Sequence, residues 1–125
     1  MRVLVCDDDP DVGGFLRATF ELENWESSLV DSGEALLEAI AGGDLPDAIV
    51  LDQVMPGLTG LETAARLRDV AFARPIILCS GHLAPELNDE IARLDLVPVN
   101  KIDMDAVVRI VRAAVGESQQ EARPA

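Results

Sequence analysis

Residues 48–57 read Ala-Ile-Val-Leu-Asp-Gln-Val-Met-Pro-Gly. The first four form a short aliphatic run, which is typical of a strand buried on both faces of a parallel sheet. Asp52 follows that run directly. In an open sheet of parallel strands, ligands bind beyond the carboxyl ends of the strands. The stretch therefore predicts a buried strand that carries a carboxylate to the edge of the sheet where ligands bind.

Four further apolar runs of strand length alternate with stretches of helical periodicity. The runs are Val3 to Cys6, Ser28 to Val30, Pro75 to Cys79 and Leu96 to Val99. Three sets of apolar residues each share a helical face: Leu36, Leu37 and Ile40 after an expected N-cap at Ser32; Leu61, Ala64, Ala65 and Leu67; and Val107, Val108, Ile110 and Val111. Five repeats of strand then helix predict an α/β fold, a doubly wound parallel sheet with right-handed crossovers and helices on both faces.

This arrangement accounts for residues 1–116 as one domain without an internal linker. From Gly116 onward the sequence is polar and has no helical periodicity. We therefore expect residues 117–125 to form a flexible C-terminal tail or the stub of a linker.

Composition excludes several classes of protein. The 125 residues are 49% hydrophobic and 26% charged, the balance of one compact domain rather than of a disordered chain. No apolar run approaches the roughly 20 residues that span a bilayer, and the start lacks the apolar region and cleavage site of a signal peptide. We therefore expect a soluble cytoplasmic protein that makes no membrane contact.

Charge and cysteine usage agree with that expectation. Acidic residues outnumber basic ones by 23 to 10, for a formal net charge of −13, and Lys101 is the only lysine. Without a basic stripe to neutralise phosphates, we expect no direct binding to nucleic acid. Cys6 and Cys79 lie inside apolar runs and lack the spacing of metal ligands, so we interpret them as reduced core residues.

Acids, a hydroxyl and an amine follow the predicted strands. They are Asp7 and Asp8 after the first strand, Asp52 after the third, Ser80 after the fourth and Lys101 after the fifth. Neighbouring carboxylates repel each other, and a hard cation such as Mg²⁺ relieves that repulsion and prefers oxygen ligands. A carboxylate can attack phosphorus to form an aspartyl phosphate, assisted by a metal, an ammonium group and a hydroxyl donor. The constellation therefore predicts phosphoryl transfer to Asp52 with Mg²⁺, Lys101 and Ser80 assisting.

These residues resemble the receiver domain of two-component response regulators, over residues 2 to about 115. The matching segments are Asp7-Asp8, Leu51-Asp52-Gln53-Val54-Met55-Pro56-Gly57 with Gly60, Ile77-Leu78-Cys79-Ser80-Gly81, and Lys101. The resemblance implies a flavodoxin-like (βα)5 sheet with strand order 2-1-3-4-5. It also implies a signalling phosphoacceptor that catalyses only its own phosphorylation and dephosphorylation. The short segment after residue 116 leads us to expect a stand-alone receiver.

The resemblance assigns a partner and a metal site. Asp52 would accept phosphate from the phosphohistidine of a histidine kinase or a histidine phosphotransfer protein, and the switched surface would then bind an unidentified downstream protein. Asp8 would bind Mg²⁺ directly and Asp7 through water, while Asp52 and the backbone carbonyl of Val54 would complete the protein ligands. No further cofactor is expected.

Besides the acids, two positions near the site match the family and two depart from it. Ser80 takes the place of the family's hydroxyl residue and Lys101 the place of its lysine. Ile102 follows that lysine where the family usually has proline, and Pro98 stands where an aromatic commonly turns inward on phosphorylation. We therefore expect the hydroxyl-to-aromatic relay to be missing, and the signal to pass through the backbone of the loops after the third and fourth strands.

The resemblance implies that the rate of dephosphorylation depends on the residues two positions after the phosphoacceptor and two after the hydroxyl, here Val54 and His82. Valine cannot orient an attacking water, whereas histidine can. We expect intermediate to slow loss of the phosphoryl group.

Simpler interpretations stay open beside these. Asp7 and Asp8 could cap the following helix, a role that we assign to Asp9 beside Pro10, and Lys101 could be an ordinary surface lysine. The chain could be a fragment of a larger response regulator or hybrid kinase, or a receiver that signals without phosphate. A metal-dependent phosphohydrolase of similar fold is the alternative from another class, although it requires a second acid where this chain has Val54.

Overall fold

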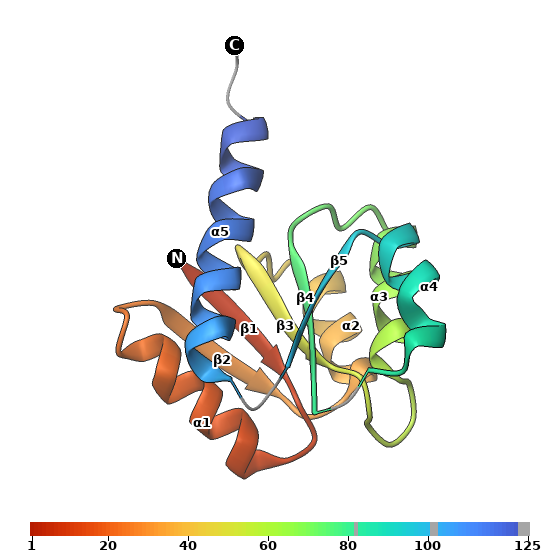
Figure 1. The fold of residues 1–125 in the computed structure, drawn as a ribbon, viewed down its shortest axis with the longest axis horizontal. Helices are drawn as coiled ribbons and strands as arrows, with labels where there is room; N and C mark the ends of the chain where they lie inside the picture. The colour runs from red at the N-terminus through yellow and green to blue at the C-terminus, as the bar shows by residue number, and fades with distance from the viewer. Residues whose placement is uncertain (82, 101–102, 123–125) are drawn as a thin grey trace.

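Strands and helices alternate along the chain in the computed structural model, which describes residues 1–81, 83–100 and 103–122 (Figure 1). The strands are β1 (Arg2–Cys6), β2 (Glu26–Val30), β3 (Ala48–Asp52), β4 (Ile76–Ser80) and β5 (Leu96–Asn100). The helices are α1 (Pro10–Glu21), α2 (Gly33–Ala41), α3 (Gly60–Asp69), the short 3₁₀ helix η1 (Pro85–Leu87), α4 (Asn88–Arg93) and α5 (Met104–Ala122).

The strands form one parallel sheet in the order β2-β1-β3-β4-β5, as the resemblance implied. The largest difference from the expected bounds is in β2, which begins at Glu26 instead of Ser28. This strand lies at the edge of the sheet and its residues are half-buried or exposed. Apolar content therefore marks only its last part, whereas the central strands β3 and β4 are buried throughout.

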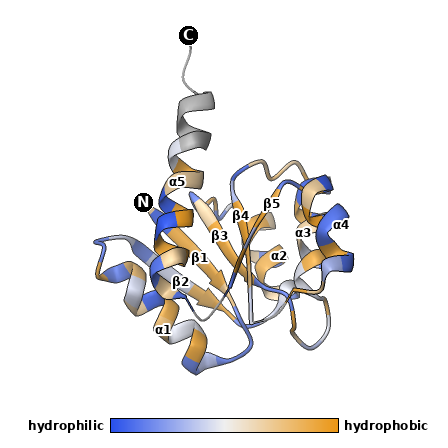
Figure 2. Ribbon diagram, viewed as in Figure 1, coloured by the Kyte–Doolittle hydropathy of each residue, from blue (hydrophilic) through white to orange (hydrophobic). Residues whose placement is uncertain are grey.

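Two apolar layers enclose the sheet, because side chains of successive strand residues point to opposite faces. On one face Val3, Val5, Val50, Ile77 and Cys79 pack against α1 and α5. On the other face Leu4, Cys6, Ile49, Leu51, Ile76 and Leu78 pack against α2, α3 and α4. Figure 2 shows the central strands as the hydrophobic middle of the molecule, with hydrophilic residues along the outer helices. Helices on both faces confirm the predicted doubly wound architecture.

Side-chain caps fix where the helices begin. The carboxylate of Asp9 accepts hydrogen bonds from the backbone N–H groups of α1 next to Pro10, as expected. Ser32 Oγ accepts from Ala35 N at 3.0 Å, which confirms the predicted N-cap of α2. Thr59 and Glu62 form a reciprocal capping box at the start of α3.

The C-terminal segment differs from expectation. Helix α5 continues to Ala122, so residues 117–122 are helical rather than an irregular tail from Gly116 onward. Glycine inside a helix costs about 1 kcal/mol relative to alanine, yet extending an existing helix is far easier than nucleating a new one. None of the described helices is long and apolar enough to cross a bilayer.

One arginine closes the amino end of the sheet. The half-buried guanidinium of Arg68, on α3, donates to four backbone carbonyl oxygens: Phe72 and Arg74 at 2.9 Å each, Leu94 at 2.9 Å and Asp95 at 3.0 Å. The first two lie between α3 and β4, and the last two between α4 and β5. Ala71 and Asp95 in these turns have φ values of 64° and 55°, in the left-handed region that ordinary residues seldom adopt. Arg68 therefore holds two strained turns together.

We expect Arg68→Met to lower the free energy of unfolding by roughly 2 to 4 kcal/mol, because four carbonyls lose a charged donor while the aliphatic stem is kept. Urea unfolding measures the change. Arg66→Met is the matched control, since Arg66 is an exposed arginine on the same helix. Equal effects of the two substitutions would contradict the assignment.

The Cys6 thiol provides a second test of the core. Burial, with the nearby carboxylates of Asp7 and Asp52, raises the pKa of Cys6 from its ordinary 9.0 to about 12. Between these two pKa values the folded protein keeps the thiol proton that the unfolded chain has released. The contribution of this thiol to the free energy of unfolding is therefore fully present below about pH 9 and is lost as pH rises. The chain has no tyrosine, so in the unfolded chain the other side chains that titrate near this range are those of Cys79 and Lys101.

We expect this thiol to remove roughly 2 kcal/mol of unfolding free energy between about pH 9 and pH 10.5. Denaturant unfolding across that range measures it, and Cys6→Ala should flatten the alkaline limb. An unchanged pH profile in Cys6→Ala would show that the thiol is not the titrating group.

Candidate functional site

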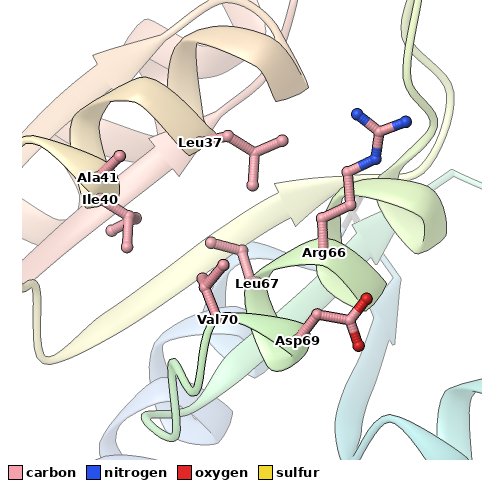
Figure 3. Close-up of a pocket in the computed structure, with 7 residues that line it drawn as sticks. All are labelled: Leu37, Ile40, Ala41, Arg66, Leu67, Asp69 and Val70. Atoms are coloured by element: carbon pink, nitrogen blue, oxygen red, sulfur yellow. The ribbon is translucent and has the colours of Figure 1, made fainter.

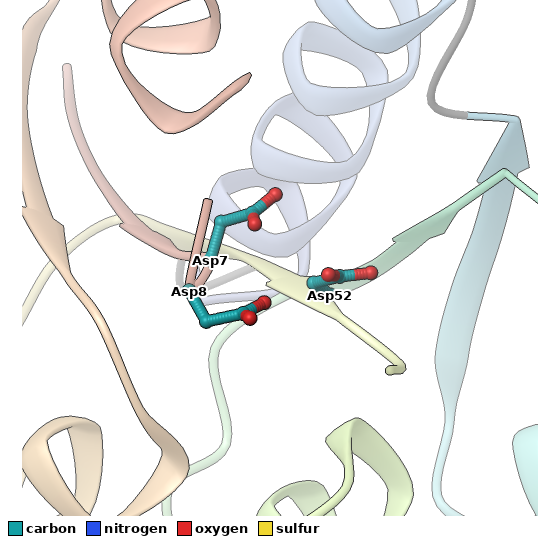
Figure 4. Close-up of side chains that lie close together, drawn as sticks. All are labelled: Asp7, Asp8 and Asp52. Carbon is teal, nitrogen blue, oxygen red and sulfur yellow. The ribbon is translucent and has the colours of Figure 1, made fainter. Parts of the chain in front are cut away.

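Three carboxylates meet at the carboxyl end of the sheet. One oxygen from each of Asp7, Asp8 and Asp52 lies within 4.8 Å of the other two. Figure 4 shows Asp7 and Asp8 after the end of β1 and Asp52 at the end of β3, with Asp8 directed toward Asp52. Asp7 is 2% exposed and Asp52 6% exposed, whereas Asp8 faces solvent. The structure therefore brings together the three acids that the sequence predicted.

The sheet itself places these acids. β1 and β3 are adjacent parallel strands, so their carboxyl ends reach the same edge. Asp7 N donates to Val30 O of β2 at 3.1 Å, and Asp7 Oδ1 accepts from Asp9 N at 2.9 Å. These two bonds, to the backbone of β2 and to the backbone of Asp9, thus fix Asp7 in its buried position. Asp9 caps α1 and is not part of the three-acid cluster.

A hollow of about 620 Å³ opens over the acids. Besides Asp7, Asp8, Asp9 and Asp52 its lining includes Val54, Ser80 and Gly81. Ser80 is 5% exposed and belongs to β4, the strand next to β3, whereas the Val54 side chain is 71% exposed. The hydroxyl and the phosphoacceptor candidate therefore face one space, as predicted. Lys101, His82 and Ile102 lie outside the described residues.

The donor set suits a hard divalent cation. Three carboxylates offer only oxygen ligands, two of them are buried, and their mutual repulsion falls when a cation lies between them. Mg²⁺ takes such ligands together with several waters, which an open hollow can supply. Asp7, Asp8 and Asp52 thus fit the metal that the sequence predicted.

Sequence reasoning missed two contacts that hold the loop after Asp52. Met55 is buried, and its Sδ lies 3.7 Å from Cys6 Sγ, which also approaches Ser32 O at 3.3 Å. Gln53 Oε1 accepts from Leu61 N at 2.9 Å. Cys6 and Met55 are far apart in the sequence, and Gln53 and Leu61 are joined across a loop. Neither helical periodicity nor strand position indicates such contacts.

Other hollows lie near the acidic cluster and elsewhere on the surface. One is a mainly apolar groove of about 580 Å³ between α2 and α3. Figure 3 shows Leu37, Ile40, Leu67 and Val70 gathered there. The charged residues in its lining are Arg66 and Asp69, both of which are exposed. A smaller hollow of about 280 Å³ includes Ser80, and the exposed Pro98 of the edge strand β5 lines it where the family commonly has an aromatic side chain. Neither resembles a second catalytic centre.

Comparison with known proteins places the chain in a family. Residues 3–98 match the family described as the response regulator receiver domain. Over 95 residues, or 76% of the chain, it is 37% identical to the response regulator MprA of Mycobacterium avium and 35% identical to the transcriptional regulatory protein TcrA of Mycobacterium tuberculosis. The matched region covers 40% and 36% of those proteins, so the chain spans about two fifths of the length of these curated relatives.

Solved structures agree. The receiver domain of the Francisella response regulator 1452 has a TM-score of 0.85 and 25% identity, covering 94% of this chain and 98% of that one. The response regulator TrrA of Thermotoga maritima, crystallised in complex with Mg²⁺ and BeF, has a TM-score of 0.79 and 27% identity, covering 90% of this chain and 97% of that one. The chain belongs to the response regulator receiver family of two-component signal transduction.

Proposed function

We propose that Asp52 is the phosphoacceptor of this receiver and takes its phosphoryl group from the phosphohistidine of a histidine kinase or a histidine phosphotransfer protein. The observation that carries the proposal is the buried Asp52 carboxylate in one hollow with Asp7, Asp8 and Ser80. No other group of three or more His, Cys, Asp or Glu side chains gathers in this way within the described ranges.

The transfer is a displacement at phosphorus. One oxygen of the Asp52 carboxylate forms a bond to phosphorus while the bond between phosphorus and the histidine nitrogen breaks. The released imidazole keeps the electron pair of that bond and takes a proton from solvent. The product is an acyl phosphate on Asp52 and a neutral histidine on the donor.

Side chains around Asp52 support this step. Asp7, Asp8, Asp52 and the Val54 carbonyl would hold Mg²⁺, which when bound neutralises charge on the transferred oxygens. Ser80 is placed at the end of the neighbouring strand, where its hydroxyl can donate to the phosphoryl group. Lys101 is the proposed amine of the site. The TrrA structure with Mg²⁺ and BeF supports the same kind of ligand for this chain.

Phosphorylation would then alter a surface that a downstream protein binds. Pro98 is exposed on β5 and has neither an aromatic ring nor a backbone N–H, so it cannot relay movement by turning inward. The change would instead travel through the loops after β3 and β4, which carry Val54 and Gly81 into the hollow over the acids.

We expect incubation with acetyl phosphate or a phosphorylated histidine kinase, in the presence of Mg²⁺, to add one phosphoryl group to the chain. Intact-mass analysis detects the adduct, and removing Mg²⁺ with a chelator should suppress it. Asp52→Ala should abolish the adduct, whereas Asp69→Ala, which removes an exposed acid on α3, should retain it. An adduct that persists in Asp52→Ala would move the phosphoacceptor elsewhere.

We expect Val54→Asn to accelerate loss of the phosphoryl group several-fold, because an amide beside the acyl phosphate can orient an attacking water and valine cannot. Decay of the phosphorylated protein is followed by mass analysis over time. Val54→Ala is the control, since it changes size without adding a polar group. If both variants decay at the wild-type rate, the side chain at this position does not govern hydrolysis.

A further inference from the structure

We propose that Glu34, in the first turn of α2, is a positioning residue for the proposed Mg²⁺ site. It would act through the loop of residues 53–59 between β3 and α3, holding the Val54 backbone carbonyl where it can serve as a ligand. This inference rests on the proposed function and adds to it a residue from an element that contributes no ligand.

A direct hydrogen bond joins Glu34 to the loop. Glu34 Oε1 accepts from Leu58 N at 3.2 Å. The acceptor is a carboxylate oxygen of an exposed side chain, and the two residues are 24 positions apart in the sequence. Glu34 is itself held in place, because Ser32 caps the same turn of α2 through its bond to Ala35 N at 3.0 Å.

Glycines lie on both sides of this contact, Gly57 at a positive φ and Gly33 at a close approach to α3. Gly57 has a φ of 79°, and a Cβ there would lie 2.8 Å from Glu34 Oε1, so the carboxylate rests directly on the turn of the loop. A Cβ on Gly33 would lie 2.1 Å from Thr63 Oγ1 and 3.1 Å from Leu58 Cβ. The start of α2 therefore packs flush against the loop and α3.

The beginning of the loop is held from the opposite side. Gln53 O accepts from Gly60 N at 3.0 Å, and the buried Met55 meets Cys6 beneath the site. Val54 lies between these anchors in the sequence and is 71% exposed, so it adds little packing. The direction of its carbonyl thus depends on how firmly its neighbours are held. Glu34 supplies the anchor at Leu58, on the far side of the Gly57 turn.

A purely structural role for Glu34 predicts something different. An acid in the first turn of a helix stabilises it through the helix dipole, and its loss would then lower stability without a specific effect on the metal. A purely electrostatic role also predicts something different. Removing any negative charge near the site would then weaken Mg²⁺ binding, whether or not that residue bonds to the loop. The affinity for Mg²⁺, compared among variants that separate charge from hydrogen bonding, distinguishes these cases.

The experiment is a calorimetric titration of the full chain with Mg²⁺ alone. We expect Glu34→Ala to weaken binding about fivefold, because the loop must be ordered when the metal binds. Glu34→Gln should stay within about twofold of wild type, since its amide oxygen can accept the same bond. Glu38→Ala, which removes an exposed acid one turn further along α2, should also stay within about twofold.

Amide exchange in the metal-free proteins gives a second readout. The Leu58 N–H should exchange faster in Glu34→Ala than in wild type, Glu34→Gln or Glu38→Ala. The inference is overturned if Glu34→Ala binds Mg²⁺ as wild type does, or if Glu34→Gln loses as much affinity as Glu34→Ala. A wild-type chain that binds no Mg²⁺, or binds it equally well after Asp8→Asn, would instead overturn the proposed metal site itself.

Discussion

Repulsion among the carboxylates of Asp7, Asp8 and Asp52 is the constraint on which the rest of the molecule depends. Their oxygens lie within 4.8 Å of one another, and two of the three residues are buried, where water screens their charges least. A flexible segment would separate such charges. Here they are fixed because they end strands that are paired on both sides and enclosed by two apolar layers. The packing energy of the core thus maintains an unfavourable arrangement that a cation and a phosphoryl group can use.

The two ends of the sheet are built differently. At the amino end, Arg68 donates four hydrogen bonds across two turns, and Arg74 donates to Leu45 and Pro46 at 3.0 and 3.1 Å and pairs with Asp47 at 3.6 Å. At the carboxyl end, the loop after β3 is held by single contacts from separate side chains. Local stability follows such differences in bonding, so among the described residues we expect the loop after β3 to open more readily than the turns at the amino end.

Features that follow from the pattern of apolar residues could be predicted from the sequence. Apolar runs located the strands, and the residues after them located Asp7, Asp8, Asp52 and Ser80, since a parallel sheet brings its carboxyl ends to one edge. Contacts between particular side chains were not predictable. The bonds of Glu34 to Leu58 and of Arg68 to the α4–β5 turn join residues 24 to 27 positions apart, and nothing in their spacing indicates a meeting. The helical course of residues 117–122 was missed because a polar segment without periodicity can still extend an existing helix.

The net charge of the chain explains why the acidic site requires positive charge from other groups. The proposed phosphoryl transfer would add negative charge to three carboxylates in a chain of net charge −13. The described arginines cannot offset it where they are bonded elsewhere: Arg2 pairs with Asp44, Arg112 with Glu23, and Arg68 with backbone carbonyls. Among the described residues that line the hollow there is no basic side chain. In the proposed function, neutralisation would therefore fall to a bound cation and to Lys101.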